Sequence, residues 1–370
     1  MHKHLIVLGT LGLALLVCTV FFIGQSGGCA KVNNPTTTIT ATTTSGSSTT
    51  LVSTSTTTGG STSTTSASTT STVPLTTSTT TTSTTTSTIW TPETSGTSED
   101  LYGIHFIDFS NGWAVGASGT VLKYTSSWAG QTSGTTEALY AVQFVTSSVG
   151  WAVGSSGTII KTINGGSSWS NQNAGASSQL NDLNFINSST GWAVGNSFTI
   201  RKTTNGGTSW DTQTTAVHQD LQGVYFLNDT TGWIVGKSSS IIKTTDGGAN
   251  WAQVTSPVSG ESFGTVVFDG SGNGWIGAGG KVIRTTDNGS NWTAITIPGA
   301  FGTINSIAVQ SSALVVAGSG GQIYKTTNAG VTWITQDSGT GVSLNGLYAP
   351  GGLTGRIVGD NGTILKYVGP

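Results

Sequence analysis

Residues 150–169 read GWAVGSSGTIIKTINGGSSW, and this stretch decides the fold. Its first five residues, Gly-Trp-Ala-Val-Gly, recur with small changes, so the tryptophan position can be followed through the chain. That position falls at residues 113, 151, 192, 233, 275, 315 and 356, the last two carrying Val315 and Arg356 instead of tryptophan. Successive copies are 38 to 42 residues apart, which is the length of one four-stranded blade of a β-propeller.

Each repeat reads as four strands. In the fourth repeat, the alternating segment 221–226 precedes the Gly-Trp strand 232–236, and a third strand follows at 240–244. A glycine turn ending in Trp251 then leads to a short outer strand. Period-2 alternation separated by Gly, Asn and Asp turns is typical of strands, and no helix pattern follows the N-terminal segment. The sequence predicts an all-β fold, a seven-bladed β-propeller of four-stranded blades over residues 89–370.

The glycine turn is a second signature. Residues 162–169 (TINGGSSW) are repeated at 203–210, 244–251, 285–292 and 326–333, and they match the Asp-box pattern Ser/Thr-x-Asp-x-Gly-x-Thr-Trp. We expect the Asp or Asn side chain to accept backbone N–H groups inside the turn, with glycine taking the positive φ. Eleven of the 12 tryptophans stand at the Gly-Trp position or end an Asp-box or its remnant. We therefore predict that they are core positions of the repeat and no aromatic ligand site.

The two ends of the repeat region complement each other. The seventh repeat stops at 364–367 without its turn, tryptophan and outer strand, whereas residues 89–92 (IWTP), before the first repeat, look like an orphan outer strand. We predict that this strand completes the last blade and closes the ring, which also protects an exposed sheet edge.

The first 30 residues have the layout of a secretory signal. Lys3 precedes an apolar run at 5–24, and small residues lead to Cys29. This ending resembles a bacterial lipoprotein signal with Cys29 as the lipidated residue, although Ser26 stands where such signals usually have leucine. Cleavage after Ala30 would instead release a soluble protein, and the apolar run is also long enough to remain as an uncleaved anchor. All three alternatives predict an exported protein in the periplasm, at the cell surface or in a lumen-like compartment.

Residues 31–88 form one segment, and from residue 35 to residue 88 it consists almost entirely of threonine and serine. Such a segment cannot bury enough apolar surface to offset its chain entropy, so we predict a disordered linker. The simplest interpretation is an inert spacer, and sugars on its hydroxyl groups would make it stiffer and longer.

The charges and cysteines exclude several functions. After residue 90 the chain has 11 Lys or Arg and 15 Asp or Glu, which argues against a nucleic-acid partner. Cys18 and Cys29 both precede the repeats, so the propeller has no disulfide or thiolate metal site. His105 and His218 lack metal-ligand spacing. Residues 269–280 begin like a calcium loop but end in Gly280 rather than Glu, and we interpret them as a hairpin turn. We expect no metal, no cofactor and a monomer.

One set of charges falls on a single repeat position, which we call the cationic ring. Seven of the 11 cations occupy it, one in each repeat: Lys123, Lys161, Lys202, Lys243, Arg284, Lys325 and Lys366. In a structural role, each side chain would cover a tryptophan and its charge would meet Asp-box acceptors. In a functional role, the ring would dock an acidic protein face, a lipid headgroup or a glycan.

The combination of Leu-x-x-Val-x-Phe, Gly-Trp-Ala-Val-Gly, Gly-x-Ile-x-Lys-Thr and Asn/Asp-Gly-Gly-x-x-Trp resembles the photosystem II stability/assembly factor family over residues 89–370. The resemblance implies a seven-bladed propeller exported to the thylakoid lumen, often as a lipoprotein. Photosynthetic members bind a reaction-centre protein precursor through basic surface residues. This chain departs from them by its Thr/Ser-rich linker and by having only three arginines, and no partner-contact residue can be matched.

We therefore predict a non-catalytic assembly-factor-like propeller that binds a protein client and is tethered to a membrane by a lipid or an N-terminal anchor. The alternative is a carbohydrate-binding or sialidase-like propeller at the cell surface, because sialidases also contain Asp-boxes. A sialidase needs three arginines around the substrate carboxylate. The available ones are Arg201, Arg284 and Arg356, of which the last two already have repeat positions. We predict no catalytic residues.

Overall fold

The computed structural model describes residues 89–299, 302–349 and 355–369, together with three short strands nearer the N-terminus. The chain divides into two compact units, Met1–Thr84 and Thr85–Pro370. In the first unit, β1 (Val17–Cys18), β2 (Thr37–Thr43) and β3 (Thr49–Ser55) form an antiparallel sheet in the order β1-β2-β3. Apart from these three strands, the predicted signal and linker, including Cys29, lie outside the described residues, and the predictions about them stay predictions. No helix among the described residues is both long and apolar enough to cross a membrane.

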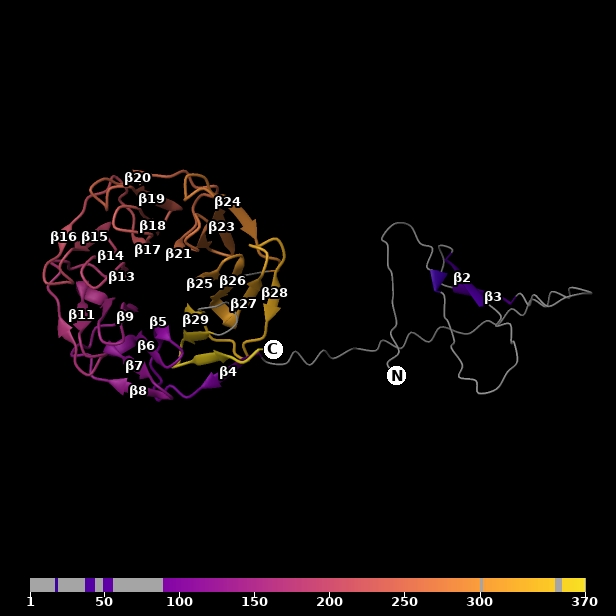
Figure 1. Ribbon diagram of the computed structural model, residues 1–370, viewed down its shortest axis with the longest axis horizontal. Helices are drawn as coiled ribbons and strands as arrows, with labels where there is room; N and C mark the ends of the chain where they lie inside the picture. Colours follow the sequence, from indigo (N-terminus) through magenta and orange to yellow (C-terminus); the bar gives the residue numbers. More distant parts are fainter. Residues whose placement is uncertain are drawn as a thin grey trace, which may run out of the picture. The chain divides into compact units, whose positions relative to one another are not determined.

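The second unit is a ring of seven four-stranded antiparallel sheets, as the sequence predicts (Figure 1). The described part of this unit contains no helix beyond the single 3₁₀ turns η1 (Ala117–Gly119), η2 (Ser155–Gly157) and η3 (Ser319–Gly321). Blades 1–6 run outward in chain order, blade 7 takes its outermost strand from before the first blade, and the first strand of each blade faces the ring axis (Figure 1).

The first four blades have these bounds. Blade 1 contains β5 (Leu101–Asp108), β6 (Asn111–Gly116), β7 (Val121–Tyr124) and β8 (Trp128–Gln131). Blade 2 contains β9 (Leu139–Phe144), β10 (Gly150–Gly154), β11 (Ile159–Thr162) and β12 (Ser170–Asn171). Blade 3 contains β13 (Leu180–Phe185), β14 (Gly191–Gly195), β15 (Thr199–Thr203) and β16 (Asp211–Thr212). Blade 4 contains β17 (Leu221–Phe226), β18 (Gly232–Gly236), β19 (Ser240–Thr244) and β20 (Ala252–Gln253).

The last three blades include the closure. Blade 5 contains β21 (Phe263–Phe268), β22 (Gly274–Ala278), β23 (Lys281–Thr285) and β24 (Thr293–Thr296). Blade 6 contains β25 (Ile304–Gln310), β26 (Ala313–Gly318), β27 (Ile323–Thr326) and β28 (Ile334–Gln336). Blade 7 contains β29 (Leu344–Tyr348), β30 (Arg356–Gly359), β31 (Ile364–Tyr367) and, from the other end of the repeat region, β4 (Trp90–Glu93).

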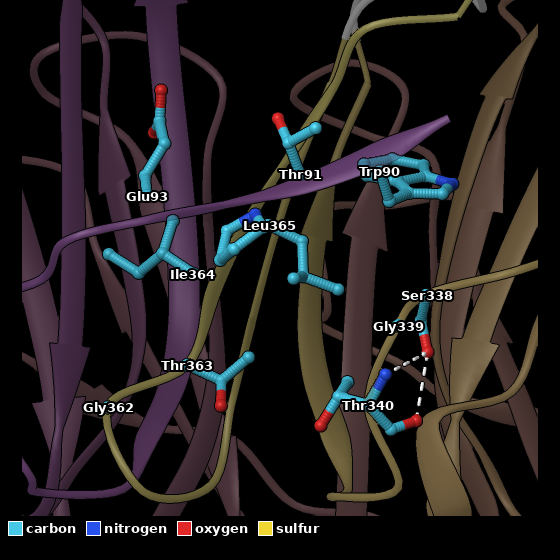
Figure 2. A pocket seen from close by; sticks show the side chains of 11 residues that line it. Trp90, Thr91, Glu93, Ser338, Gly339, Thr340, Gly362, Thr363, Ile364 and Leu365 are labelled. Carbon is cyan, nitrogen blue, oxygen red and sulfur yellow. Dashed lines mark hydrogen bonds between the residues drawn. The ribbon is translucent and has the colours of Figure 1, made fainter. Parts of the chain in front are cut away.

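The predicted closure is confirmed. β4 pairs antiparallel with β31, with Tyr367 opposite Trp90 and Ile364 opposite Glu93. The indole of Trp90 is 2% exposed and donates to Gln336 Oε1 of blade 6 at 3.0 Å. β4 therefore contributes both sheet pairing and core packing. A cavity of about 270 Å³ borders it, between β31 and the loop that carries Ser338 and Thr340 (Figure 2).

The hydrophobic core lies between adjacent blades. The five Gly-Trp indoles are at most 1% exposed. In the first four blades each indole stacks on the last phenylalanine of the next blade's inner strand, for example Trp192 on Phe226 with 3.4 Å between ring centroids. The Asp-box tryptophan of that next blade, here Trp251, meets the same phenyl ring edge-on. The prediction that the Gly-Trp tryptophans are core residues is confirmed, and each of these indoles joins two blades. Of the Asp-box tryptophans, Trp128 and Trp292 are buried and the others are half-buried.

The Asp-boxes adopt the predicted geometry. In blade 2, Asn164 Oδ1 accepts the N–H of Ser168 at 2.9 Å, and the Thr162 hydroxyl accepts the N–H of Gly166 at 2.8 Å. Gly165 and Gly166 both have positive φ. Gly165 N also donates to Ser148 O in the turn between the blade's first two strands. The Asp-box turn and this first turn therefore lie at the same end of the blade, which we call the Asp-box face.

Candidate functional site

The cationic ring is built by the strand register. In every blade the ring cation lies directly opposite the Gly-Trp position on the neighbouring strand, as Lys161 does opposite Trp151. Cross-strand neighbours on one face of a sheet are close enough to interact. In blades 1–5 the cation lies over the indole, 5.1 to 6.0 Å from the ring centroid. This is cation–π distance.

The ring also links neighbouring blades. Lys202 Nζ donates to the carbonyl of Gly247, in the Asp-box of blade 4, at 2.9 Å. Lys243 Nζ donates to Asn288 O, in the Asp-box of blade 5, at 2.6 Å. In the first three blades the indole N–H makes the same connection, as Trp151 Nε1 does to Gly206 O at 3.1 Å. Each Trp–Lys pair thus anchors the Asp-box of the next blade.

These contacts leave the ring cations partly covered. Six of the seven are half-buried, and only Lys366 is exposed. Burial lowers the pKa of Lys161 and of Lys243, which the Asp287 carboxylate partly opposes for Lys243. The cations thus cover the tryptophans and contact the Asp-boxes, which is the structural role expected for the ring. A docking role for the same residues remains a prediction.

The three arginines are not brought together. Arg201 lies on blade 3 and bonds to Thr212 and to Gly175 O, whereas Arg284 lies on blade 5. Arg356 of blade 7 forms a bidentate ion pair with Glu93 of β4, with Nε–Oε2 at 2.7 Å and Nη2–Oε1 at 3.1 Å. The arginine cluster that a sialidase needs is therefore not formed by these residues.

The histidines and the calcium-like loop have structural environments. His105 Nδ1 accepts the N–H of Phe144 at 3.4 Å, and burial lowers the pKa of His105 to about 4. His218 packs against Phe198. Asp269 Oδ1 accepts the N–H of Ser271 at 2.8 Å inside the β21–β22 turn, which confirms the hairpin interpretation. Among the described residues, no three His, Cys, Asp or Glu side chains are grouped for a metal ion.

Sequence reasoning missed the polar side chains of the inner strands. Asp182 Oδ2 accepts the N–H of Val224 in the next blade at 2.9 Å, and Asn184 Oδ1 accepts the N–H of Phe226. Burial raises the pKa of Asp182 to about 7 against the lowering effect of its two backbone hydrogen bonds, from Val224 and Leu183. The only available signal was a carboxylate at a repeat position that is Gly103 in blade 1 and Gly223 in blade 4.

The chain matches the family model described as photosynthesis system II assembly factor YCF48 at residues 123–210, 172–308 and 210–349. These segments together cover more than half of the chain. The chain belongs to this family. No curated protein sequence matches it significantly.

Solved structures of the family are similar to the propeller. The structure described as YCF48 bound to D1 peptide has a TM-score of 0.65 at 20% identity, covering 76% of this chain and 97% of that one. YCF48 from Cyanidioschyzon merolae has a TM-score of 0.62 at 18% identity, covering 75% and 98%. Virginiamycin B lyase from Staphylococcus aureus, at 14% identity, has a TM-score of 0.67 and covers 75% and 98%. At these identities the likeness shows the fold alone, since unrelated activities share it.

Proposed function

We propose that this chain is a non-catalytic assembly-factor propeller that binds a protein client outside the cytoplasm. The observation that carries the proposal is membership of the assembly-factor family through residues 123–349. The relative of known structure described as bound to a D1 peptide supports a peptide segment as the class of ligand. The client is then an extended segment of a membrane protein that is being assembled, and the tether keeps the propeller near it.

The Asp-box face is the surface we propose for this contact. The cationic ring lies beside it, and Lys202 and Lys243 of that ring are held by hydrogen bonds to the next blade. Lys366 is exposed, and the Nζ atoms of Lys123 and Lys325 lie over aromatic rings rather than against a carboxylate. Partly free cations at regular spacing attract an acidic segment and raise its association rate.

The test uses the full-length chain and peptides that tile the non-cytoplasmic segments of membrane proteins from the same organism. Binding is measured by interferometry for the native chain and for a triple variant, K123Q/K325Q/K366Q. We expect the variant to lose at least tenfold in affinity for the peptides that bind, and its melting temperature to stay close to the native value.

A matched control removes cations outside the ring, by K237Q and K281Q. These two lysines pair with Asp220 and Glu261 in exposed salt bridges, so their loss has little effect on stability. The proposal is wrong about the face if both variants weaken binding equally. It is wrong about the function if no peptide binds the native chain.

A further inference from the structure

The seam between blades 5 and 6 departs from the repeat. In blades 1–3 the indole N–H of the Gly-Trp residue donates to the Asp-box of the next blade. At this seam Trp275 is 1% exposed and its Nε1 has no hydrogen-bond partner, as is also true of Trp233 in blade 4. The next inner strand has Val309 where the four preceding seams have a stacked phenylalanine. The smaller side chain leaves the indole without a stacked ring and leaves space beside it.

The ring cation of this blade also differs. Arg284 replaces the lysine found in the other six blades, and its Nε is buried with no hydrogen-bond partner. Its guanidinium forms no hydrogen bond or salt bridge to any described residue. Arg201 Nε is also unpaired, but its Nη2 bonds to Gly175 O, and Arg356 is ion-paired with Glu93. A buried guanidinium N–H that remains unpaired is costly.

Trp275 and Arg284 both line one cavity. Its volume is about 250 Å³, and its wall includes Trp275, Arg284, Asp269, Asn273, Ser312 and Ala329. The polar side chains besides Arg284 come from the first turns of blades 5 and 6, and Ala329 comes from the Asp-box of blade 6. The cavity therefore lies at the Asp-box face and is large enough for a short organic acid or one side chain.

We infer that this cavity, which we call the Arg284 pocket, binds a carboxylate group. The guanidinium of Arg284 supplies charged N–H donors in the cavity wall, and carboxylate is the planar acceptor that arginine pairs with best. The group comes either from a small free acid or from an Asp, Glu or C-terminal residue of a polypeptide. This inference stands on the unpaired guanidinium of Arg284 in the cavity wall and does not require the proposed protein client.

The second charge in the wall sets the selectivity. Asp269 lines the same cavity, and its carboxylate already accepts hydrogen bonds from Ser271 N, Asn273 N and Asn273 Nδ2. Arg284 and Asp269 do not form an ion pair. Because the two charges balance, the pocket favours a singly charged carboxylate over a doubly charged phosphate.

The test is a ¹⁵N NMR titration of the full-length chain with propionate, followed at the indole N–H of Trp275 and the Nε–H of Arg284. W275F and R284K assign the two signals. We expect both signals to move on one saturable curve, with smaller effects from phosphate and none from the neutral isostere propionamide. Two peptides separate the sources: one has an internal glutamate and an amidated end, and the other has a free C-terminal carboxylate.

R284K is also the test of mechanism, because lysine at this position is accommodated in the other six blades and the variant should fold. We expect it to bind propionate at least tenfold more weakly, as lysine lacks the planar pair of donors. The matched control, K202R in blade 3, should leave the propionate curve unchanged. The inference is overturned if propionate causes no saturable shift, if propionamide acts equally, or if R284K binds as the native chain does. If a peptide shifts the signals at lower concentration than propionate does, the carboxylate comes from a polypeptide. If propionate shifts them at lower concentration than either peptide, it comes from a free acid.

Discussion

Replacing Glu93 by glutamine should weaken the closure of the ring at one side chain. Glu93 Oε2 accepts Arg356 Nε at 2.7 Å and Trp128 Nε1 at 2.9 Å, while Oε1 accepts Arg356 Nη2 at 3.1 Å. The Glu93 and Arg356 side chains are only 19% and 11% exposed. This single carboxylate therefore connects β4, blade 7 and blade 1.

The magnitude follows from the burial of the pair. Removing one partner of a buried ion pair typically costs 3–5 kcal/mol, because the other charge is left unpaired. Glutamine retains one oxygen acceptor, so we expect E93Q to lose about 2–4 kcal/mol of unfolding free energy. For a domain of this size that corresponds to a melting temperature lower by roughly 5–10 °C. The control D220N acts on an exposed pair with Lys237, and it should change stability by about 1 kcal/mol or less.

The pH dependence gives an independent check. Burial raises the pKa of Glu93, but hydrogen bonds from Arg356 and Trp128 and the charge of Arg356 outweigh it, so the folded pKa is below its ordinary value. A lowered folded pKa means that the stabilisation is complete above the unfolded pKa of about 4.3 and is lost as pH falls through the folded value. Urea unfolding of the native chain and E93Q should therefore give a difference that is full at pH 7 and shrinks below pH 4. A difference below about 0.5 kcal/mol at pH 7, or one that persists at low pH, would refute this account.

Three further outcomes are expected. Deleting residues 89–98, which removes β4, should lower the melting temperature far more than deleting 35–85, and equal effects in calorimetry would contradict the role of β4 in closure. W192A should destabilise the propeller by about 3–5 kcal/mol in urea unfolding, because its indole is fully buried against Phe226 of the next blade. D182N should flatten the pH dependence of stability: the pKa of Asp182 is raised to about 7, so the folded native chain binds the extra proton and loses stability as pH rises from about 4 to 7. An unchanged slope in urea midpoints across that range would show that Asp182 is not the group responsible.

The number of blades and the closure could be predicted because they depend on repeated positions. A tryptophan position recurring every 38 to 42 residues sets the blade length, and the missing fourth strand of the last repeat matched an unassigned strand before the first. These are one-dimensional patterns, and each repeat gives an independent reading of the same local structure. The buried Gly-Trp indoles and the Asp-box hydrogen bonds followed for the same reason.

The contacts between blades could not be predicted in the same way. Glu93 and Arg356 are 263 residues apart and meet only because the ring closes. The sequence placed Arg356 correctly at a degenerate tryptophan position, but the pattern carries no information on which acid faces it. Asp182 is similar, since its raised pKa comes from burial against the next blade rather than from a charged neighbour.

A repeat fold gives each side chain six internal comparisons, and these separate scaffold from function. The lysines of the cationic ring cover indoles and hold the next Asp-box, as Lys202 does. This geometry, repeated from blade to blade, explains the presence of most of these lysines without a ligand. The same explanation fails for Arg284, which has neither the hydrogen bond of Lys202 nor the ion pair of Arg356. The cavities beside Arg284 and beside β4 both border blades 6 or 7, where the Gly-Trp motif has degenerated. A seam between two blades is normally filled by a tryptophan and the phenylalanine on which it stacks. Where either residue is missing, the seam has room for a side chain from another molecule. Recognition by this propeller is therefore expected at the seams where the repeat is broken.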